Sequence, residues 1–186
     1  MKKSLLLALP LALAACGSGT ETSQEAKPEP EATSPLVQRL DETVLVVDAN
    51  GAGATGQPLM RFGTAREEVD AALSQAYGGT PELGENGECG AGPMQFSTYG
   101  PLKLSFQNSK FVGWNLGEGA EVATSDGVQP GTTPFALLKE EREVRDIDST
   151  LTGEFEYTSA DYGTIGGFSE NGQISSLHAG MNCFFR

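Results

Sequence analysis

Apolar and polar residues recur along the chain with two different periods, and these periods predict helices and strands. Between residues 65 and 76 the apolar positions have helical spacing: Ala65, Val69, Ala72, Leu73 and Ala76. A short strand is predicted just before, at residues 59–62. Thr64 and Glu67 form a capping-box pattern, so we expect the helix to begin at Thr64. We expect it to end at the glycines that follow Tyr77.

A weaker helical pattern lies at residues 131–138. Pro134 suits the first helical position, because the N–H that proline lacks is not needed there. Phe135 and Leu138 supply the apolar stripe of this second predicted helix.

A period of two predicts antiparallel strands. Residues 102–106 alternate between apolar and polar, and residues 110–116 return after a short turn. Strict alternation places Phe111 and Trp114 on opposite faces of the returning strand. Further strands are predicted at residues 43–47, 94–97, 155–157, 166–168 and 173–179.

A glycine-rich segment follows the first predicted strand. Residues 51–56 match G-x-G-x-x-G, a pattern that holds a pyrophosphate when it leads directly into a helix. Here Gln57-Pro58 interrupts the segment, and the helix begins only at Thr64. We therefore interpret residues 51–56 as a flexible connection and expect no cofactor.

The two halves of the chain share residue types at nearly constant offsets. Gly63-Thr64 and Gly131-Thr132 are 68 positions apart. An offset of 63 relates the following pairs: Tyr99 and Tyr162, Asn108 and Asn171, Phe111 and Ile174, Trp114 and Leu177, Gly117 and Gly180. We therefore predict an α+β fold made of two tandem units, each a helix plus an antiparallel β-sheet, at about residues 43–120 and 121–186.

This pattern resembles a known architecture. The turn Phe62-Gly63-Thr64, followed by Glu67-Glu68-Val69, is similar to the opening of repeats in β-lactamase-inhibitor-protein-like domains. Single-copy relatives of these domains include the small accessory lipoprotein of the outer-membrane β-barrel assembly machinery. The resemblance covers residues 59–183 and implies a module that binds protein. It carries over no binding residue, because no binding-loop motif of either family is present.

The N-terminus has the pattern of an export signal. Lys2 and Lys3 precede a short apolar run, which ends in Leu13-Ala14-Ala15-Cys16. This ending resembles the bacterial lipobox, so we expect residues 1–15 to be removed and Cys16 to be lipidated. An ordinary secretory signal that leaves Cys16 as a thiol is the alternative. Gly17 in place of aspartate favours the outer membrane by analogy with enterobacterial sorting, with the protein anchored there and facing the periplasm.

Composition separates a tether from a domain. Residues 16–35 contain Gly, Ser, Thr, Glu and Pro with almost no apolar side chain, which predicts a solvated tether. Residues 36–186 have the length of one domain. With Lys2 and Lys3 removed, 10 of the 12 basic residues remain against 25 acidic residues, giving −15. This charge disfavours nucleic acid as a partner and leaves the lipid anchor as the contact with the membrane.

Two cysteines remain once Cys16 is assigned to the lipid. In an oxidising periplasm Cys89 and Cys183 are most simply a disulfide. A reactive thiol is the alternative, and no cationic residue sits beside either cysteine in the sequence to support it.

Few residues have the types or spacing of catalytic groups. His178 is the single histidine and a candidate general base, but no G-x-S-x-G motif accompanies it. One histidine and two cysteines leave too few ligands for zinc, and no calcium-loop motif occurs. We therefore expect neither a catalytic centre nor a metal site, with a small periplasmic hydrolase using His178 as the alternative.

Aromatic residues on the predicted sheet are the best candidates for a binding surface. They are Trp114, Tyr99, Tyr162 and Phe111, and His178 on the last strand is added to them. An outward-facing Trp114 would make the free sheet face the partner site. The resulting hypothesis is a non-enzymatic module that binds an envelope protein in assembly, scaffolding or inhibition. A purely structural envelope protein is a third interpretation.

Overall fold

The protein folds mainly as β-sheet. The computed structural model describes residues 34, 36, 40, 43–160 and 163–183, all within one compact unit. These residues form twelve strands and two short helices. The predicted α+β fold of two tandem helix-plus-sheet units is therefore wrong. The two halves do not form separate sheets, because strands from both halves pair with each other in one continuous sheet.

The helices and strands follow one another in a simple order. The helices are α1 (Arg66–Tyr77) and α2 (Phe135–Glu141). The strands of the first half are β1 (Leu45–Asp48), β2 (Gly51–Ala54), β3 (Met60–Arg61), β4 (Glu82–Asn86), β5 (Met94–Tyr99), β6 (Leu102–Gln107) and β7 (Lys110–Leu116). Those of the second half are β8 (Val122–Thr124), β9 (Val144–Asp146), β10 (Glu154–Thr158), β11 (Thr164–Glu170) and β12 (Gln173–Gly180).

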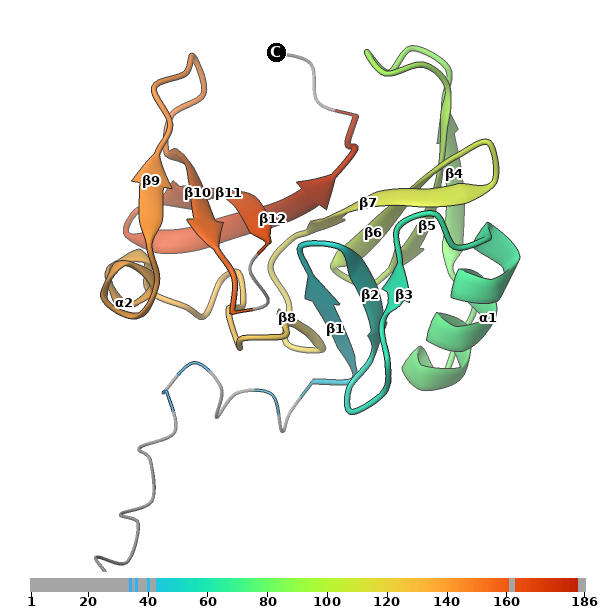
Figure 1. The fold of residues 1–186 in the computed structure, drawn as a ribbon, viewed down its shortest axis with the longest axis horizontal. Coiled ribbons are helices and arrows are strands. Elements are labelled where there is room, and N and C mark those ends of the chain that lie inside the picture. The colour runs from blue at the N-terminus through green and yellow to red at the C-terminus, as the bar shows by residue number, and fades with distance from the viewer. Residues whose placement is uncertain (1–33, 35, 37–39, 41–42, 161–162, 184–186) are drawn as a thin grey trace, which may run out of the picture. The chain divides into compact units, whose positions relative to one another are not determined.

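Eight strands form the larger sheet, in the order β4-β5-β6-β7-β12-β11-β10-β9, with antiparallel neighbours throughout. The last strand, β12, therefore lies in the middle, where Ala179 pairs with Trp114 of β7. Figure 1 shows both helices and the smaller sheet on one side of this eight-stranded sheet. We call the other side, which no described helix or strand covers, the open face.

The smaller sheet has the order β3-β2-β1-β8, with β1 and β8 parallel. The glycine-rich segment predicted as a flexible connection contributes β2, so that prediction is wrong. A Cβ atom on Gly51 would overlap the carbonyl oxygen of Met60, and one on Gly53 would crowd Leu59. These glycines allow the neighbouring chain to approach closely, and no helix starts beside them to bind a phosphate.

A β-bulge changes the faces of β7. The register between β6 and β7 shifts between Ser105 and Phe106, which makes Val112 the extra residue. Because of this extra residue, Phe111 and Trp114 are both fully buried, although strict alternation predicts them on opposite faces. The bulge thus directs both side chains into the core.

Residues related by the offset of 63 take matching places in two hairpins. Asn108 and Asn171 each adopt a φ of 52° in the turns that join β6 to β7 and β11 to β12. Ser175 is the extra residue of a second bulge, at the offset of 63 from Val112. The hairpins were predictable from these turns, but both belong to the same sheet.

The first helix begins later than its sequence pattern predicts. Ala65 is the N-cap residue and makes no side-chain cap, so the predicted capping box of Thr64 and Glu67 is wrong. The carbonyl oxygen of Thr64 instead accepts a hydrogen bond from the N–H of Phe111, at 2.9 Å, which holds Thr64 against β7. The predicted end is confirmed: Gly78 caps the helix with a φ of 77°.

The core lies between the covered face of the eight-stranded sheet, the smaller sheet and the helices. Its largest fully buried side chains are Trp114, Tyr99, Tyr157, Phe106, Phe111 and Phe155. Val69 and Leu73 are the buried residues of α1, and Leu138 is the one of α2. One continuous cluster joins both halves of the chain.

Candidate functional site

Trp114 belongs to the core and does not form a surface. Its side chain is 0% exposed, and its indole Nε1 donates a hydrogen bond to the carbonyl oxygen of Asp48 at 2.8 Å. This bond links the larger sheet to β1 in the smaller one. The prediction that Trp114 marks a partner site is therefore wrong, because the bulge at Val112 keeps the side chain on the covered face.

Tyr99, the second aromatic candidate, is 1% exposed. Its hydroxyl lies 3.1 Å from the hydroxyl of Ser74 and donates to the carbonyl oxygen of Asp70 at 3.1 Å. Burial, reinforced by the Asp70 carboxylate, raises the pKa of Tyr99 to about 12. Tyr99 is a structural residue that joins β5 to α1, so its predicted place in an interface is also wrong.

His178 lies on the open face and is half-buried. Its ring centroid is 5.9 Å from that of Phe168, and its neighbours directly across the strands are Asn115 and Gly166. These neighbours are an aromatic ring, a side-chain amide and a glycine. The remaining predicted site residues, Cys16 and Tyr162, lie outside the residues that the structure describes.

Cys89 and Cys183 are brought together as the sequence indicates, with their Sγ atoms at bonding distance and their Cα atoms 5.0 Å apart. The bond ties the residues after β12 to the loop between β4 and β5. We call residues 181–183 the C-terminal strap. Its first residue, Met181, donates its backbone N–H to the carbonyl oxygen of Val112 at 2.7 Å and lies over Gly113 on the open face.

The most exposed part of the larger sheet is the edge strand β4. Four of its five residues are exposed, and no described strand pairs with its outer edge. Leu83 is 67% exposed, which is the highest value among the described large apolar side chains. An outer edge of this kind presents free backbone donors and acceptors to a further strand.

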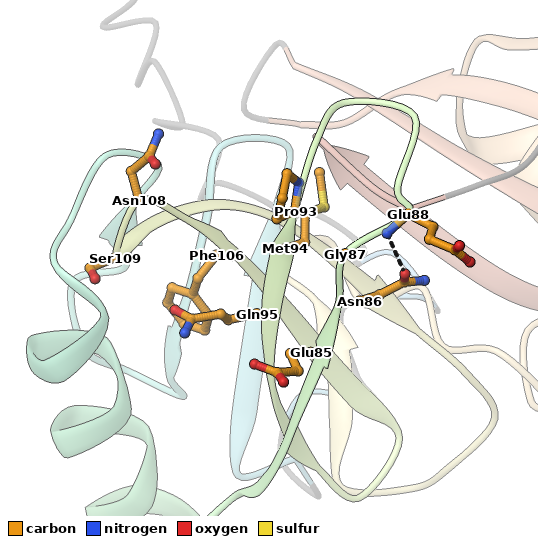
Figure 2. A pocket seen from close by; sticks show the side chains of 10 residues that line it. All are labelled: Glu85, Asn86, Gly87, Glu88, Pro93, Met94, Gln95, Phe106, Asn108 and Ser109. Carbon is orange, nitrogen blue, oxygen red and sulfur yellow. Dashed lines mark hydrogen bonds between the residues drawn. The ribbon is translucent and has the colours of Figure 1, made fainter.

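A groove of about 770 Å³ runs beside β4. Figure 2 shows that Glu85 and Gln95 extend toward the side on which Phe106 lies. Asn86 turns back and accepts a hydrogen bond from the N–H of Glu88 at 2.8 Å. A shallower groove continues along the strand past Leu83. Carboxylates and amides line the combined surface, together with the guanidinium of Arg66 and the apolar side chains of Leu83, Met94 and Phe106.

The basic side chain nearest to this groove is already engaged. Arg66 Nε lies 3.2 Å from a carboxylate oxygen of Asp70, and its second nitrogen donates to the carbonyl oxygen of Phe96 at 2.8 Å. Glu85 and Glu88 make no ion pair with a described basic residue. The edge of β4 is therefore negative. This edge was hard to predict from the sequence, because residues 82–90 contain three glycines and Leu83 is the one large apolar side chain among them.

Two further properties bear on the function. Within the part of the chain that the structure describes, no group of three or more His, Cys, Asp or Glu side chains is arranged to hold a metal ion. No described helix is long and apolar enough to cross a membrane.

No protein-family model matches the chain, and neither a curated protein nor a solved structure is significantly similar to it.

Proposed function

We propose that this protein is a lipoprotein of the outer membrane that faces the periplasm and binds an envelope protein without catalysing a reaction. The unpaired outer edge of β4 is the observation that carries the proposal. The partner adds an extended segment to this edge. The N-terminal signal, ending at Cys16, supports the cellular location.

The chemistry of the edge specifies the partner segment. Glu85 and Glu88 select a segment that carries lysine or arginine, because opposite charges attract at the edge. Leu83 offers an apolar contact on the same face of the strand as Glu85. Glutamates on an edge strand also discourage pairing with unsuitable chains, so the same residues provide selectivity.

Site-specific crosslinking tests the binding edge. We expect a photoreactive residue placed at Leu83, in the full chain in the bacterial envelope, to crosslink to a segment that contains lysine or arginine. Glu85→Lys should reduce this crosslink at least tenfold, since it reverses the charge of the groove. The matched control is Glu170→Lys, an exposed charge reversal next to the turn between β11 and β12, and it should leave the crosslink unchanged.

Equal crosslinking in both charge-reversal variants would contradict the edge assignment. A crosslinked segment without basic residues would contradict the chosen partner chemistry.

The lipid anchor is tested separately. Cys16→Ser is expected to abolish the incorporation of labelled fatty acid into the protein, because the acyl chains are attached at Cys16. Unchanged labelling would contradict the lipid anchor.

Turnover of any ester or amide substrate that is lost in His178→Ala would contradict the non-enzymatic assignment.

A further inference from the structure

A small hollow lies between the C-terminal strap and the open face, and it shares Asn86, the last residue of β4, with the groove beside that strand. Its volume is about 230 Å³. The polar side chains around it come from three parts of the fold: Lys103 and Ser105 from β6, Asn115 from β7, and Asn86 and Asn182 from beside the disulfide. The ring of Phe96 and the sulfur of Cys183 complete its wall.

The lining is rich in hydrogen-bond donors, although the chain as a whole carries a net charge of −13. Lys103, Ser105 and Asn115 supply an ammonium, a hydroxyl and amide N–H groups. Asn182 contributes no further donor, because its Nδ2 atom already donates to the carbonyl oxygens of Ala179 and Gly180. None of the described side chains that line the hollow is acidic. A positively charged hollow in an acidic protein is suited to an anion.

Lys103 is the charged member of the lining. Five of the seven described basic side chains have a carboxylate within 4 Å: Arg61, Arg66, Lys139, Arg142 and Arg145. Lys103 and Lys110 have no such partner among the described residues. The Nζ atom of Lys103 lies 5.8 Å from the ring centroid of Phe96, so its local partner is an aromatic face.

The surrounding groups are held in place by the fold. Lys103 pairs directly with Asn115 across β6 and β7, which fixes the spacing of their backbones. Asn182 is held through its Nδ2 atom, which donates to the carbonyl oxygen of Ala179 at 3.1 Å. Asn86 donates to the sulfur of Cys183 at 3.4 Å. The disulfide and the strands thus hold the asparagines in place beside Lys103, which is itself exposed.

We propose that this hollow binds a single carboxylate group. One ammonium and several neutral donors match a charge of −1, whereas a phosphate dianion would bring a second negative charge into a chain that is already strongly acidic. The ring of Phe96 provides an apolar surface for the carbon that bears the carboxylate. The carboxylate can be that of a small free acid or of a peptide C-terminus.

NMR titration of the ¹⁵N-labelled mature chain in non-ionic detergent micelles tests this site at constant ionic strength. We expect acetate and N-acetyl-dialanine to shift the side-chain amide signals of Asn86, Asn115 and Asn182 saturably. Acetamide and the C-terminal amide of N-acetyl-dialanine should cause no saturable shift. Saturation by acetate but not by the peptide supports a small free acid as the ligand.

Two matched variants identify the residue responsible. Lys103→Gln should weaken acetate binding at least tenfold, because the only cation among the described residues of the lining is lost. Lys110→Gln removes the other described lysine that has no carboxylate within 4 Å; this residue is exposed at the start of β7, and the substitution should leave binding unchanged. The backbone amide spectrum verifies that each variant is folded.

The proposal is overturned by equal acetate binding in Lys103→Gln and the unmodified protein, by saturable binding of acetamide, or by tighter binding of inorganic phosphate than of acetate. None of these outcomes depends on the β4 edge, so this proposal and the proposed function can fail independently.

Discussion

Trp114 connects the two sheets through one side chain. Its ring fills the space between β7 and the smaller sheet, and its indole N–H satisfies the carbonyl oxygen of Asp48. A buried carbonyl that loses its donor costs about 1–3 kcal/mol. The residue therefore contributes through both volume and hydrogen bonding.

Replacing Trp114 with phenylalanine separates these contributions in part. We expect Trp114→Phe to lower the free energy of unfolding by about 2–4 kcal/mol, from the lost hydrogen bond and from the smaller ring. Urea unfolding followed by circular dichroism measures this loss. Phe168→Leu, at a half-buried position on the open face, is the control and should cost less than about 1.5 kcal/mol. An equal loss of unfolding free energy in the two variants would contradict the role of Trp114 in joining the two sheets.

One residue, the bulge residue Val112, explains why the candidate site was predicted wrongly from the sequence. The hydrophobic pattern correctly indicates that Phe111 and Leu116 lie on a strand, but it contains no signal for the bulge at Val112. Without that bulge the faces of β7 are assigned incorrectly, and Trp114 becomes a candidate for an interface. The cysteine pair was predictable, because assigning Cys16 to the predicted lipid anchor leaves two cysteines.

The C-terminal strap depends on the glycine beneath it. A Cβ atom on Gly113 would overlap the backbone oxygen of Met181, so Gly113→Ala must push the strap away from the sheet. We expect this substitution to destabilise the fold by about 1–3 kcal/mol in chemical denaturation. Gly87→Ala is the control, since nothing lies within 4 Å of an added Cβ there, and it should change stability by less than about 0.5 kcal/mol.

The disulfide at the end of the strap closes a long loop. Cys89 and Cys183 are 94 residues apart, for which the chain-entropy model gives about 4–5 kcal/mol of stabilisation. We expect the double variant Cys89→Ser with Cys183→Ser to lose stability of this order in urea unfolding. Reduced unmodified protein should match the double variant. Full stability in both samples would contradict a structural role for the bond.

At the scale of elements, prediction succeeds where turns and alternation are both strong. The hairpins around Asn108 and Asn171 were predictable because these residues adopt the left-handed conformation that such turns require. Four strands were missed: β2, β4, β8 and β9. They are short or glycine-rich, and tertiary pairing stabilises them more than local preference does. The proposed docking edge is one of these missed strands, so the sequence alone did not indicate it.

The whole molecule is expected to lose stability at alkaline pH. Burial raises the pKa of Tyr99 to about 12 and raises that of the fully buried Tyr157 well above 10. The folded state therefore keeps these phenols protonated after the unfolded chain has begun to lose its protons, at a pH of about 10. Stability is fully present below pH 10 and is lost as the pH rises toward 12.

Replacing Tyr99 with phenylalanine tests this pH dependence. The Tyr99→Phe variant should be less stable than the unmodified protein at pH 7, because the hydrogen bonds to Ser74 and Asp70 are lost. Between pH 10 and 12 it should lose about 2–3 kcal/mol less than the unmodified protein, since one titrating group is absent. Urea unfolding at several pH values measures both effects. Parallel pH profiles would contradict the burial of a titrating phenol.

The arrangement of the two halves could not be predicted from local patterns. Pairing between β7 and β12 joins residues such as Trp114 and Ala179, which are far apart in the sequence. The offset of 63 correctly related residues of the two hairpins. It did not indicate that β7 of the first hairpin pairs with β12 of the second. The prediction of two tandem units therefore failed at this contact and at the parallel pairing of β1 with β8, which also joins the two halves.

The central position of β12 has a consequence for truncated forms of the protein. Without β12, the edge of β7 that β12 pairs with has no strand beside it. A stop codon at Gln173 would therefore remove β12 and leave a gap in the middle of the eight-stranded sheet. Such a stop codon should be as damaging as one far upstream.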